Sequence, residues 1–408
     1  MKFVLGDFIK FLMSNIFYQG VILISDFYLL RIIDKELVGL WQYALLLQTY
    51  TLILRLGIIN SFNRQYPYYL ALENNSDAKK LYDTTFYFVK FNTVVQFLFF
   101  VICGLIVFLL YDNKLLGMTL LVMAVYSVLD SFNNFQEAVL RNVGNLSGIN
   151  IAKLAAAFTA LILIVFPYSF GFVGYLVRII FLVLIPCLVM LFFTRFNWKT
   201  SFSWIVWRDL LSDGWKFWLW GYAKTVLKSI PRVYIVSFGS FSTLGLYAPV
   251  NWLLLSFSLV TGSLNAYLYP ILSTQAAKGE KDLSRNTFKI NLILFLSLFP
   301  FVFLGCLLLP RIINSFLPGY IEAIVPMQVM LVASLFEVFS VSTTLWASKG
   351  EWKKIFINQV FSLISTTIVF TCVQFINGSL LLNVSYAVLA VSFINAVVIS
   401  ILMHRESK

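Results

Sequence analysis

The chain has 408 residues, of which 60% are hydrophobic and only 12% are charged, and its formal net charge is +12. Soluble domains carry about 25% charged residues, so this composition excludes a soluble globular protein. Apolar stretches of about 20 residues recur along the chain between short polar gaps, which is typical of a polytopic α-helical membrane protein.

Hydropathy along the chain predicts about twelve transmembrane helices. In chain order the predicted spans are 8–30, 37–61, 85–110, 116–139, 148–167, 170–193, 214–238, 244–270, 287–309, 322–346, 354–376 and 379–402. The longest connections between the predicted spans, near 62–84, 194–213 and 271–286, are too short to fold into a soluble catalytic domain. All chemistry is therefore expected in or beside the bilayer, and the protein is not expected to be an enzyme.

The arrangement of Lys and Arg along the chain explains the positive net charge. If both termini are cytoplasmic, most of these residues fall in cytoplasmic segments, and the opposite side holds only Arg31, Lys35, Lys114 and Arg311. This bias is the one described by the positive-inside rule for short loops. We therefore expect a multi-pass protein with both termini in the cytoplasm, and a nucleic-acid partner is not expected.

The two halves of the sequence resemble each other. Sliding the chain by 206 residues aligns 7–41 with 213–247 without a gap and matches Tyr28 with Tyr234. Because each half holds six predicted spans, the halves should be related by a pseudo-two-fold axis along the membrane normal, as in many transporters. The duplication predicts an N-terminal six-helix lobe, a cytoplasmic interfacial linker and a C-terminal six-helix lobe, at 1–193, 194–213 and 214–408.

Three cations lie inside the seventh predicted span. Lys224, Lys228 and Arg232 are spaced i, i+4, i+8, which places them on one face of a helix. A charge at the centre of a bilayer costs about 2.5–3.5 kcal/mol, so this cationic stripe is expected to face a wet cavity that accepts an anion. The alternative is that the three cations only pair with carboxylates of other spans.

Four carboxylates fall within the predicted spans, at Asp26, Asp130, Glu137 and Glu337. Asp130 and Glu337 occupy nearly equivalent positions in the two repeats. A carboxylate buried in a membrane can exchange a proton near neutral pH, so the set is a candidate for coupling to H⁺ or Na⁺. Polar contacts between helices explain the same residues equally well, and both interpretations are open.

Other polar residues within the spans are candidates for contact with a substrate: Arg55, Arg178, Asn15 and Gln19. Asn15 and Gln19 could hydrogen-bond sugars or line water. The sequence has neither a His or Cys cluster with metal-site spacing nor a Gly-rich phosphate loop, and its only histidine is His404. No cofactor and no metal are expected.

Three segments carry a resemblance to a known family. The segment LLRIIDKELVGLW at 29–41 is a short hydrophilic turn followed by Gly and an aromatic residue, at the exit of the first span. Residues 56–67 mark the exit of the second span, and LPGYIEA at 317–323 leads into the tenth. Together with the six-plus-six layout, these segments resemble the Wzx-type lipid-linked polysaccharide flippases of the multidrug/oligosaccharidyl-lipid/polysaccharide exporter superfamily.

The resemblance implies a MATE-like fold and a defined activity. It implies that undecaprenyl-pyrophosphate-linked O-antigen or capsule repeat units move from the cytoplasmic to the periplasmic leaflet of the bacterial inner membrane, by alternating access coupled to an ion or to the membrane potential. The implied partners are this lipid-linked anionic oligosaccharide, membrane lipids, H⁺ or Na⁺, and polysaccharide assembly proteins.

The residues favour this interpretation over two alternatives. A cationic stripe suits a pyrophosphate and acidic sugars. A multidrug cation exporter of the same fold should instead show acidic residues at this place. A membrane polysaccharide polymerase or ligase is expected to carry a large periplasmic loop, and the sequence shows none.

Overall fold

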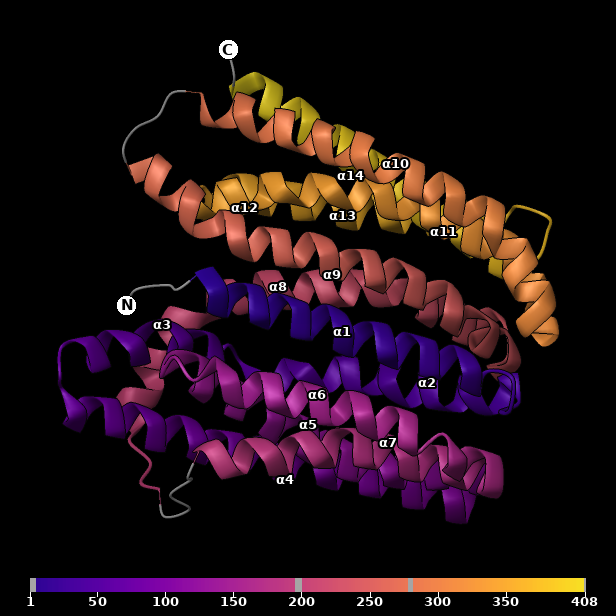
Figure 1. Cartoon of the computed structure of the whole chain (residues 1–408), viewed down its shortest axis with the longest axis horizontal. Coiled ribbons are helices and arrows are strands. Elements are labelled where there is room, and N and C mark those ends of the chain that lie inside the picture. The colour runs from indigo at the N-terminus through magenta and orange to yellow at the C-terminus, as the bar shows by residue number, and fades with distance from the viewer. Residues whose placement is uncertain (1–4, 195–199, 278–281, 407–408) are drawn as a thin grey trace. The chain divides into compact units, whose positions relative to one another are not determined.

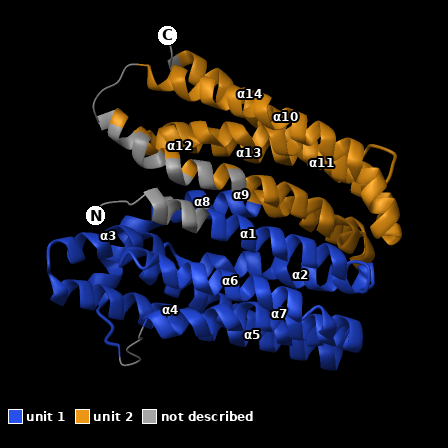
Figure 2. Ribbon diagram, in the orientation of Figure 1, with its two compact units in different colours: residues 1–226 blue, residues 227–408 orange. Residues whose placement is uncertain are grey.

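The computed structural model describes residues 5–194, 200–277 and 282–406. Within these residues the chain forms fourteen α-helices, α1 to α14, and three short 3₁₀ segments, η1 to η3 (Figure 1). The chain divides into two compact units, residues 1–226 and 227–408, shown in blue and orange in Figure 2. The predicted all-helical architecture is confirmed.

Unit 1 contains α1 to α7 and the N-terminal part of α8. The bounds of these elements are α1 Leu5–Leu29, α2 Lys35–Thr51, η1 Leu52–Arg55, α3 Ile58–Ala71, α4 Asn75–Leu110, α5 Lys114–Asn142, α6 Leu146–Ile162, α7 Val165–Thr194 and α8 Trp204–Phe238. The antiparallel helices α4 and α5 pack along most of their length, α1 packs on α6, and α7 contacts both α5 and α6.

Unit 2 contains the C-terminal part of α8 and the remaining elements. Their bounds are α9 Phe241–Ala277, α10 Leu283–Phe316, η2 Pro318–Ala323, α11 Ile324–Phe336, η3 Glu337–Phe339, α12 Ser340–Ser348, α13 Trp352–Val373 and α14 Leu380–Glu406. Helix α11 packs against α9, α10 and α14, and α13 packs against α14.

The helices have the length and surface of membrane spans. In the part of the chain that the structure describes, eight helical segments are long and apolar enough to cross a membrane. Large apolar side chains such as Phe192, Leu296 and Phe361 are exposed on them. Soluble proteins rarely expose continuous apolar surface of this kind, because water makes it costly. The chain is thus a multi-pass membrane protein.

Helix breaks fall inside three of the predicted spans, and one of these, 148–167, contains the turn between α6 and α7. The other two, the second and the tenth, are spans interrupted by 3₁₀ segments. The second, 37–61, is divided into α2, η1 and α3, because Leu56 and Gly57 adopt left-handed conformations with φ of 47° and 76°. The tenth, 322–346, is interrupted by η3, which begins at Glu337. A break in a helix at membrane depth leaves backbone groups that need protein or water as partners. Both breaks therefore mark places where lipid alone cannot surround the chain.

Helices extend into all three long connections between the predicted spans, 62–84, 194–213 and 271–286. Hydropathy detects only the apolar part of a helix, and the ends of α3, α4, α8 and α10 carry charged and polar side chains. Residues 195–199 and 278–281 of these connections lie outside the described residues.

The boundary between the two units falls inside α8. This helix runs without interruption from Trp204 to Phe238, so one helix contributes to both units. The division into two repeated six-helix lobes, 1–193 and 214–408, with a linker at 194–213, stays a prediction.

An aromatic core joins α3, α4, α5 and the start of α8 in unit 1. Phe62, Phe86, Phe135 and Leu210 are all buried in it. The rings of Phe86 and Phe135 stack with their centroids 5.2 Å apart and an interplanar angle of 6°. Stacked rings in a close-packed core restrict the sliding of one helix along another. This core therefore fixes the positions of the polar residues that lie next to it.

Candidate functional site

The candidate site of unit 1 lies at the break in the second span. Arg55 ends η1, and its Nη2 donates to Oδ2 of Asp130 on α5 at 2.9 Å. Gln48 of α2 donates to the same oxygen at 3.5 Å. The side chains of Arg55 and Asp130 are 23% and 29% exposed, so the pair is partly shielded. The left-handed Leu56 and Gly57 then turn the chain into α3.

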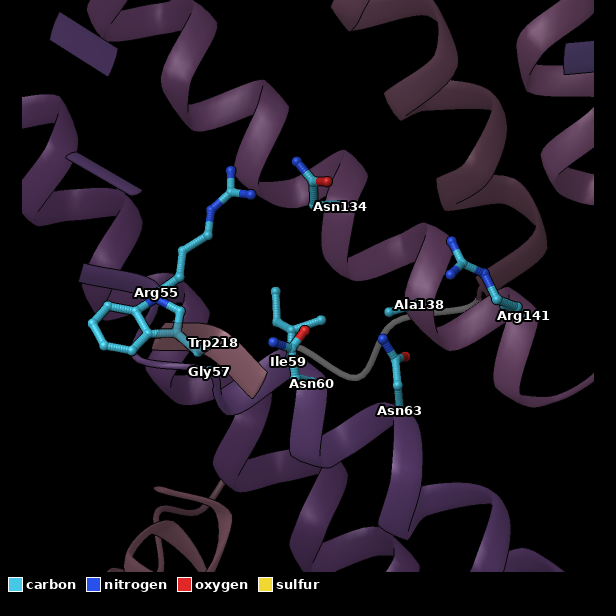
Figure 3. A pocket seen from close by; sticks show the side chains of 9 residues that line it. All are labelled: Arg55, Gly57, Ile59, Asn60, Asn63, Asn134, Ala138, Arg141 and Trp218. Atoms are coloured by element: carbon cyan, nitrogen blue, oxygen red, sulfur yellow. The ribbon is translucent and has the colours of Figure 1, made fainter. Parts of the chain in front are cut away.

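A cavity of about 240 Å³ lies beside Arg55. Figure 3 shows two guanidinium groups, three carboxamides and an indole ring around it. Its walls come from η1, α3, α5 and α8, and all of them belong to unit 1. This unit 1 cavity is lined by Arg55, Gly57, Ile59, Asn60, Asn63, Asn134, Ala138, Arg141 and Trp218.

Close backbone contact between α3 and α8 forms one wall of the cavity. A Cβ atom on Gly57 would lie 2.6 Å from the carbonyl oxygen of Gly214 and 2.7 Å from Cβ of Trp218, so only glycine fits. The Ser61 hydroxyl donates to the backbone oxygen of Leu210. The carboxylate of Asp213 on α8 accepts hydrogen bonds from two α3 side chains, Arg64 and Gln65. These contacts hold Trp218 at the cavity wall.

A second charged network touches the cavity through Arg141. Glu137 on α5 accepts from Arg141 at 2.8 Å and lies 3.6 Å from Nζ of Lys153 on α6. Lys153 donates to Oδ1 of Asn15 on α1 at 2.6 Å. The network therefore joins α1, α5 and α6. Gln19, one turn after Asn15 on α1, is half-buried.

Arg178 on α7 is buried, with 1% of its side chain exposed. It donates to Oδ1 of Asp26 on α1 at 2.9 Å, to the hydroxyl of Ser25, and to the backbone oxygen of Ala160 on α6 at 3.5 Å. Its guanidinium thus ties three helices together. Binding of a substrate by Arg178 would require these bonds to open.

The carboxylate of unit 2 lies at the break in the tenth span. Glu337 is the first residue of η3, and its Oε2 accepts from Nζ of Lys228 on α8 at 3.1 Å. Lys228 also donates to the hydroxyl of Ser258 on α9 at 3.1 Å. The side chains of Lys228 and Glu337 are 33% and 17% exposed. In both units, one member of a cation–carboxylate pair therefore belongs to a 3₁₀ segment that interrupts a span.

The three cations of the predicted stripe follow one another along α8. Lys224 is exposed, and Lys228 and Arg232 are half-buried. Lys224 belongs to unit 1, whereas Lys228 and Arg232 belong to unit 2. Lys228 has the carboxylate partner described above. The role of the stripe in binding a substrate stays a prediction.

The structure adds residues that the sequence analysis did not select. Among the predicted substrate-binding residues only Arg55 lines the unit 1 cavity, and it is joined there by Asn60, Asn63, Asn134 and Trp218. Two signals in the sequence point to them. Asn60 and Asn63 are spaced i, i+3 just after the left-handed Gly57, and Asn134 follows Asp130 by one helical turn.

The described residues contain no group of His, Cys, Asp and Glu side chains that could hold a metal ion. The intramembrane carboxylates instead accept hydrogen bonds from cationic side chains, at Asp26, Asp130, Glu137 and Glu337. Any ion that binds one of these carboxylates must therefore compete with Lys or Arg.

The comparisons with known proteins agree on the class of the chain. A model of the polysaccharide biosynthesis protein family matches residues 69–326, which is well over half of the chain. No curated protein sequence matches it.

Solved structures show the same fold at low identity. An inward-facing multidrug resistance MATE family transporter of the MOP superfamily is 14% identical, with a TM-score of 0.78 over 95% of this chain and 94% of that one. An outward-facing MATE family transporter is 13% identical, with a TM-score of 0.67 over 98% and 95%. A MATE protein in the straight conformation is 13% identical, with a TM-score of 0.68 over 98% and 96%.

These similarities confirm the MATE-like fold and the exporter-superfamily resemblance inferred from the sequence. The family match carries the identification, because at such low identity the solved structures show the fold alone. The chain belongs to the polysaccharide biosynthesis protein family.

Proposed function

We propose that the protein is a flippase that moves undecaprenyl-pyrophosphate-linked oligosaccharide repeat units from the cytoplasmic to the periplasmic leaflet. The observation that carries the proposal is the match of residues 69–326 to the polysaccharide biosynthesis family on a chain with the fold of membrane exporters. The solved structures that share this fold are those of transporters. Moving an assembled lipid-linked product is the task that fits this protein best.

The cation–carboxylate pairs supply the chemistry of binding and release. A pyrophosphate that approaches Lys228 competes with Glu337 for the same ammonium group, which lies 3.1 Å from the carboxylate. Charge-assisted contacts to phosphate are short and strong, so a phosphate can take the place of Glu337 on Lys228 once that carboxylate is protonated. Lys224 and Arg232 extend the positive field along α8 and attract the same anion.

The carboxylates offer a way to couple export to an ion gradient or to the membrane potential. Protonation of Glu337 removes the negative partner of Lys228 and leaves that cation ready for a substrate anion. Export would then be linked to H⁺, to Na⁺ held by the same oxygens, or to the membrane potential acting on the charged substrate. Replacement of Glu337 by Gln is expected to change the dependence of export on the pH gradient if H⁺ is the coupling ion.

The proposal is tested by complementation. A strain that lacks its own flippase is given the chain at matched membrane expression, and surface polysaccharide is scored together with lipid-linked repeat units on the cytoplasmic side. Restored polysaccharide with loss of the accumulated intermediate is the expected result. Persistent accumulation of the intermediate would overturn the proposal.

A multidrug cation exporter is the second candidate, because two of the similar solved structures are those of multidrug resistance transporters. The two candidates differ in the charge of the cargo. A drug exporter should lower the susceptibility of a pump-deficient strain to organic cations without changing surface polysaccharide. A polymerase or ligase would instead change the length or attachment of polysaccharide while the repeat unit is already periplasmic.

The proposed setting is the bacterial inner membrane with both termini in the cytoplasm. The lipid-linked anionic oligosaccharide and membrane lipids are the proposed partners, and polysaccharide assembly proteins on the periplasmic side would receive the product. No cofactor takes part in this proposal.

A further inference from the structure

We infer that the unit 1 cavity is a sugar subsite, which binds one hydroxyl-rich, uncharged ring of the substrate and not its pyrophosphate. The inference rests on the proposed flippase function and adds a second site to it. The pyrophosphate is assigned to the cations of α8, and a sugar ring to unit 1. Four observations on the cavity support this division.

The cations of the cavity already have anionic partners. Arg55 lies 2.9 Å from Asp130, and Arg141 lies 2.8 Å from Glu137. A phosphate that binds Arg55 would have to displace Asp130 and leave that carboxylate without its cation in a partly shielded place, which is costly. A neutral ligand can bind while both pairs stay intact. The arrangement therefore favours an uncharged ligand.

The carboxamides offer both donors and acceptors. Asn63 accepts from Asn142 through Oδ1, which leaves its NH₂ group to donate. Asn134 donates to the backbone oxygen of Asp130 through Nδ2, which leaves its Oδ1 to accept. Asn60 adds an exposed carboxamide. A sugar hydroxyl both donates and accepts, whereas a fully ionised phosphate only accepts and is repelled by a carbonyl oxygen.

Trp218 contributes a ring and a donor. Its indole stacks on Tyr222 with the centroids 5.5 Å apart and an interplanar angle of 7°, which holds the ring in place at the cavity wall. Its Nε1 is buried and has no hydrogen-bond partner among the described residues. A buried donor without a partner is unfavourable, so a small turn of the indole that brings Nε1 to a ligand oxygen in the cavity would be favoured. The apolar face of a pyranose ring, which presents C–H groups, also packs well on an aromatic ring.

The size of the cavity limits the ligand to a single ring. Its volume of about 240 Å³ is smaller than the roughly 300–1,000 Å³ of pockets that enclose drug-sized molecules. A repeat unit of several sugars cannot enter as a whole. One sugar of the repeat unit would therefore occupy the cavity and set the selectivity of the flippase.

The inference is tested with the full-length protein purified in detergent. The probe is the neutral monosaccharide fraction released by acid hydrolysis of the surface polysaccharide of the strain that the chain complements. Binding is followed by saturation-transfer NMR, with inorganic pyrophosphate as competitor. The test variants are Trp218→Phe, which keeps a ring but removes the donor, and Asn134→Ala, which removes the acceptor. The matched controls are Trp204→Phe on the exposed start of α8 and Asn286→Ala on the exposed start of α10.

We expect at least one sugar of the fraction to bind the wild type and both controls. Each test variant should bind it about tenfold more weakly, as expected for the loss of one hydrogen bond in a shielded site. Millimolar pyrophosphate should leave sugar binding unchanged. Absence of sugar binding, displacement of the sugar by pyrophosphate, or equal weakening in the controls would overturn the inference. Variants whose melting temperature equals that of the wild type exclude misfolding as the cause.

Failure of this inference is distinguishable from failure of the proposed function. If the chain restores surface polysaccharide but binds no sugar in unit 1, only the subsite is wrong. If the chain fails to restore polysaccharide, the flippase proposal fails whatever the purified protein binds. Export by Trp218→Phe should fall more for a repeat unit that contains the bound sugar than for a foreign repeat unit that lacks it.

Discussion

Arg178 shows which contacts a buried charged residue of this chain needs at membrane depth. It is 1% exposed, and its guanidinium donates to Asp26, Ser25 and Ala160. A buried charge is tolerated only when it is paired and hydrogen-bonded. The stability of the α1–α6–α7 packing therefore depends on the charge of Asp26.

Asp26→Asn is expected to lower the stability of unit 1 markedly. Removing one partner of a buried ion pair costs about 3–5 kcal/mol, because the other charge is left without compensation. The measurement is the melting temperature of the protein in detergent. The double variant Asp26→Leu with Arg178→Met removes both charges and should recover most of the loss. A single variant as stable as the wild type would contradict this account.

Lys228→Ala is expected to reduce export by about ten- to a hundredfold, if one charge-assisted contact to phosphate is lost. Lys228→Arg keeps the charge and should retain much more export, and Lys228→Glu should abolish it. Lys114→Ala, which removes an exposed cation at the start of α5, is the matched control and should have little effect. Surface polysaccharide at equal membrane expression is the measurement.

The pairing of Lys228 with Glu337 offers another explanation that can be separated from substrate binding. If Lys228 only neutralises Glu337, the double variant Lys228→Met with Glu337→Leu should restore export, because no charge remains unpaired. If Lys228 attracts the substrate, the double variant should stay as defective as Lys228→Ala. Full export by the Ala and Glu variants of Lys224, Lys228 and Arg232 would show that the cationic stripe takes no part in transport.

The types of residue at the charged sites were predictable from the sequence, but their partners were not. Charges within an apolar span stand out, so Asp26, Asp130 and Glu337 are found directly. The partner of Asp26 is Arg178, far along the chain, and helical spacing on one span carries no information on which face of another span it meets. Trp218 was missed as a site residue for a different reason. A Trp in a membrane protein is usual at the membrane–water interface, so it does not stand out in the sequence.

At the scale of elements, the contact between α3 and α8 decides the shape of the cavity. Gly57 has φ of 76°, and both Gly57 and Gly214 leave no room for a side chain. Small residues at helix crossings allow such close approach of backbones. The cavity wall therefore depends on two glycines from distant parts of the chain.

Gly57→Ala is expected to destabilise unit 1 more than Gly350→Ala does. Both glycines have positive φ, at 76° and 71°, so both substitutions strain the backbone. A Cβ at Gly350 meets nothing within 4 Å, whereas one at Gly57 meets Gly214 and Trp218. The difference between the two variants isolates the cost of overpacking, about 1–3 kcal/mol. Equal melting temperatures in detergent would show that α3 and α8 separate easily.

Element boundaries were the part of the fold that hydropathy predicted least well. The spans 37–61 and 322–346 are interrupted by η1 and η3, and neither break contains a proline. The break after η1 depends on the left-handed Leu56, a conformation that leucine rarely adopts. The surrounding helices impose it, so local sequence does not reveal it.

At the scale of the whole molecule, the alternation of helices and the bias of Lys and Arg predict one topology. Short turns after α3, α5 and α12 should be cytoplasmic, and the turn after α4 should be periplasmic. Single cysteines at Glu73 and Lys349 should react with an impermeant thiol reagent only in opened cells, and one at Asp112 should react in intact spheroplasts. The four native cysteines must first be replaced. Labelling of Glu73 from outside would contradict the topology, and labelling of Glu73 and Lys349 from opposite sides would contradict the predicted duplication.

The class of the molecule was the most predictable property, because it depends on sums over the chain. Composition alone indicates a helical membrane protein, and averaging over the whole chain tolerates an error in any one span. The site depends on contacts between single residues, so one error in the placement of a side chain is not compensated by the rest of the chain. The MATE-like fold was therefore predicted from the sequence, and the unit 1 cavity was not.

The contact between Ser61 and Leu210 also has a consequence for biosynthesis. These residues are 149 positions apart, and a ribosome adds about 5–20 residues per second, so α3 waits roughly 7 to 30 s before its partner on α8 exists. During that interval Ile58 and Phe62, which are fully covered in the finished protein, lack part of their cover. A chain arrested before Trp204 keeps this face uncovered and offers it to the insertion machinery or to membrane quality-control proteases.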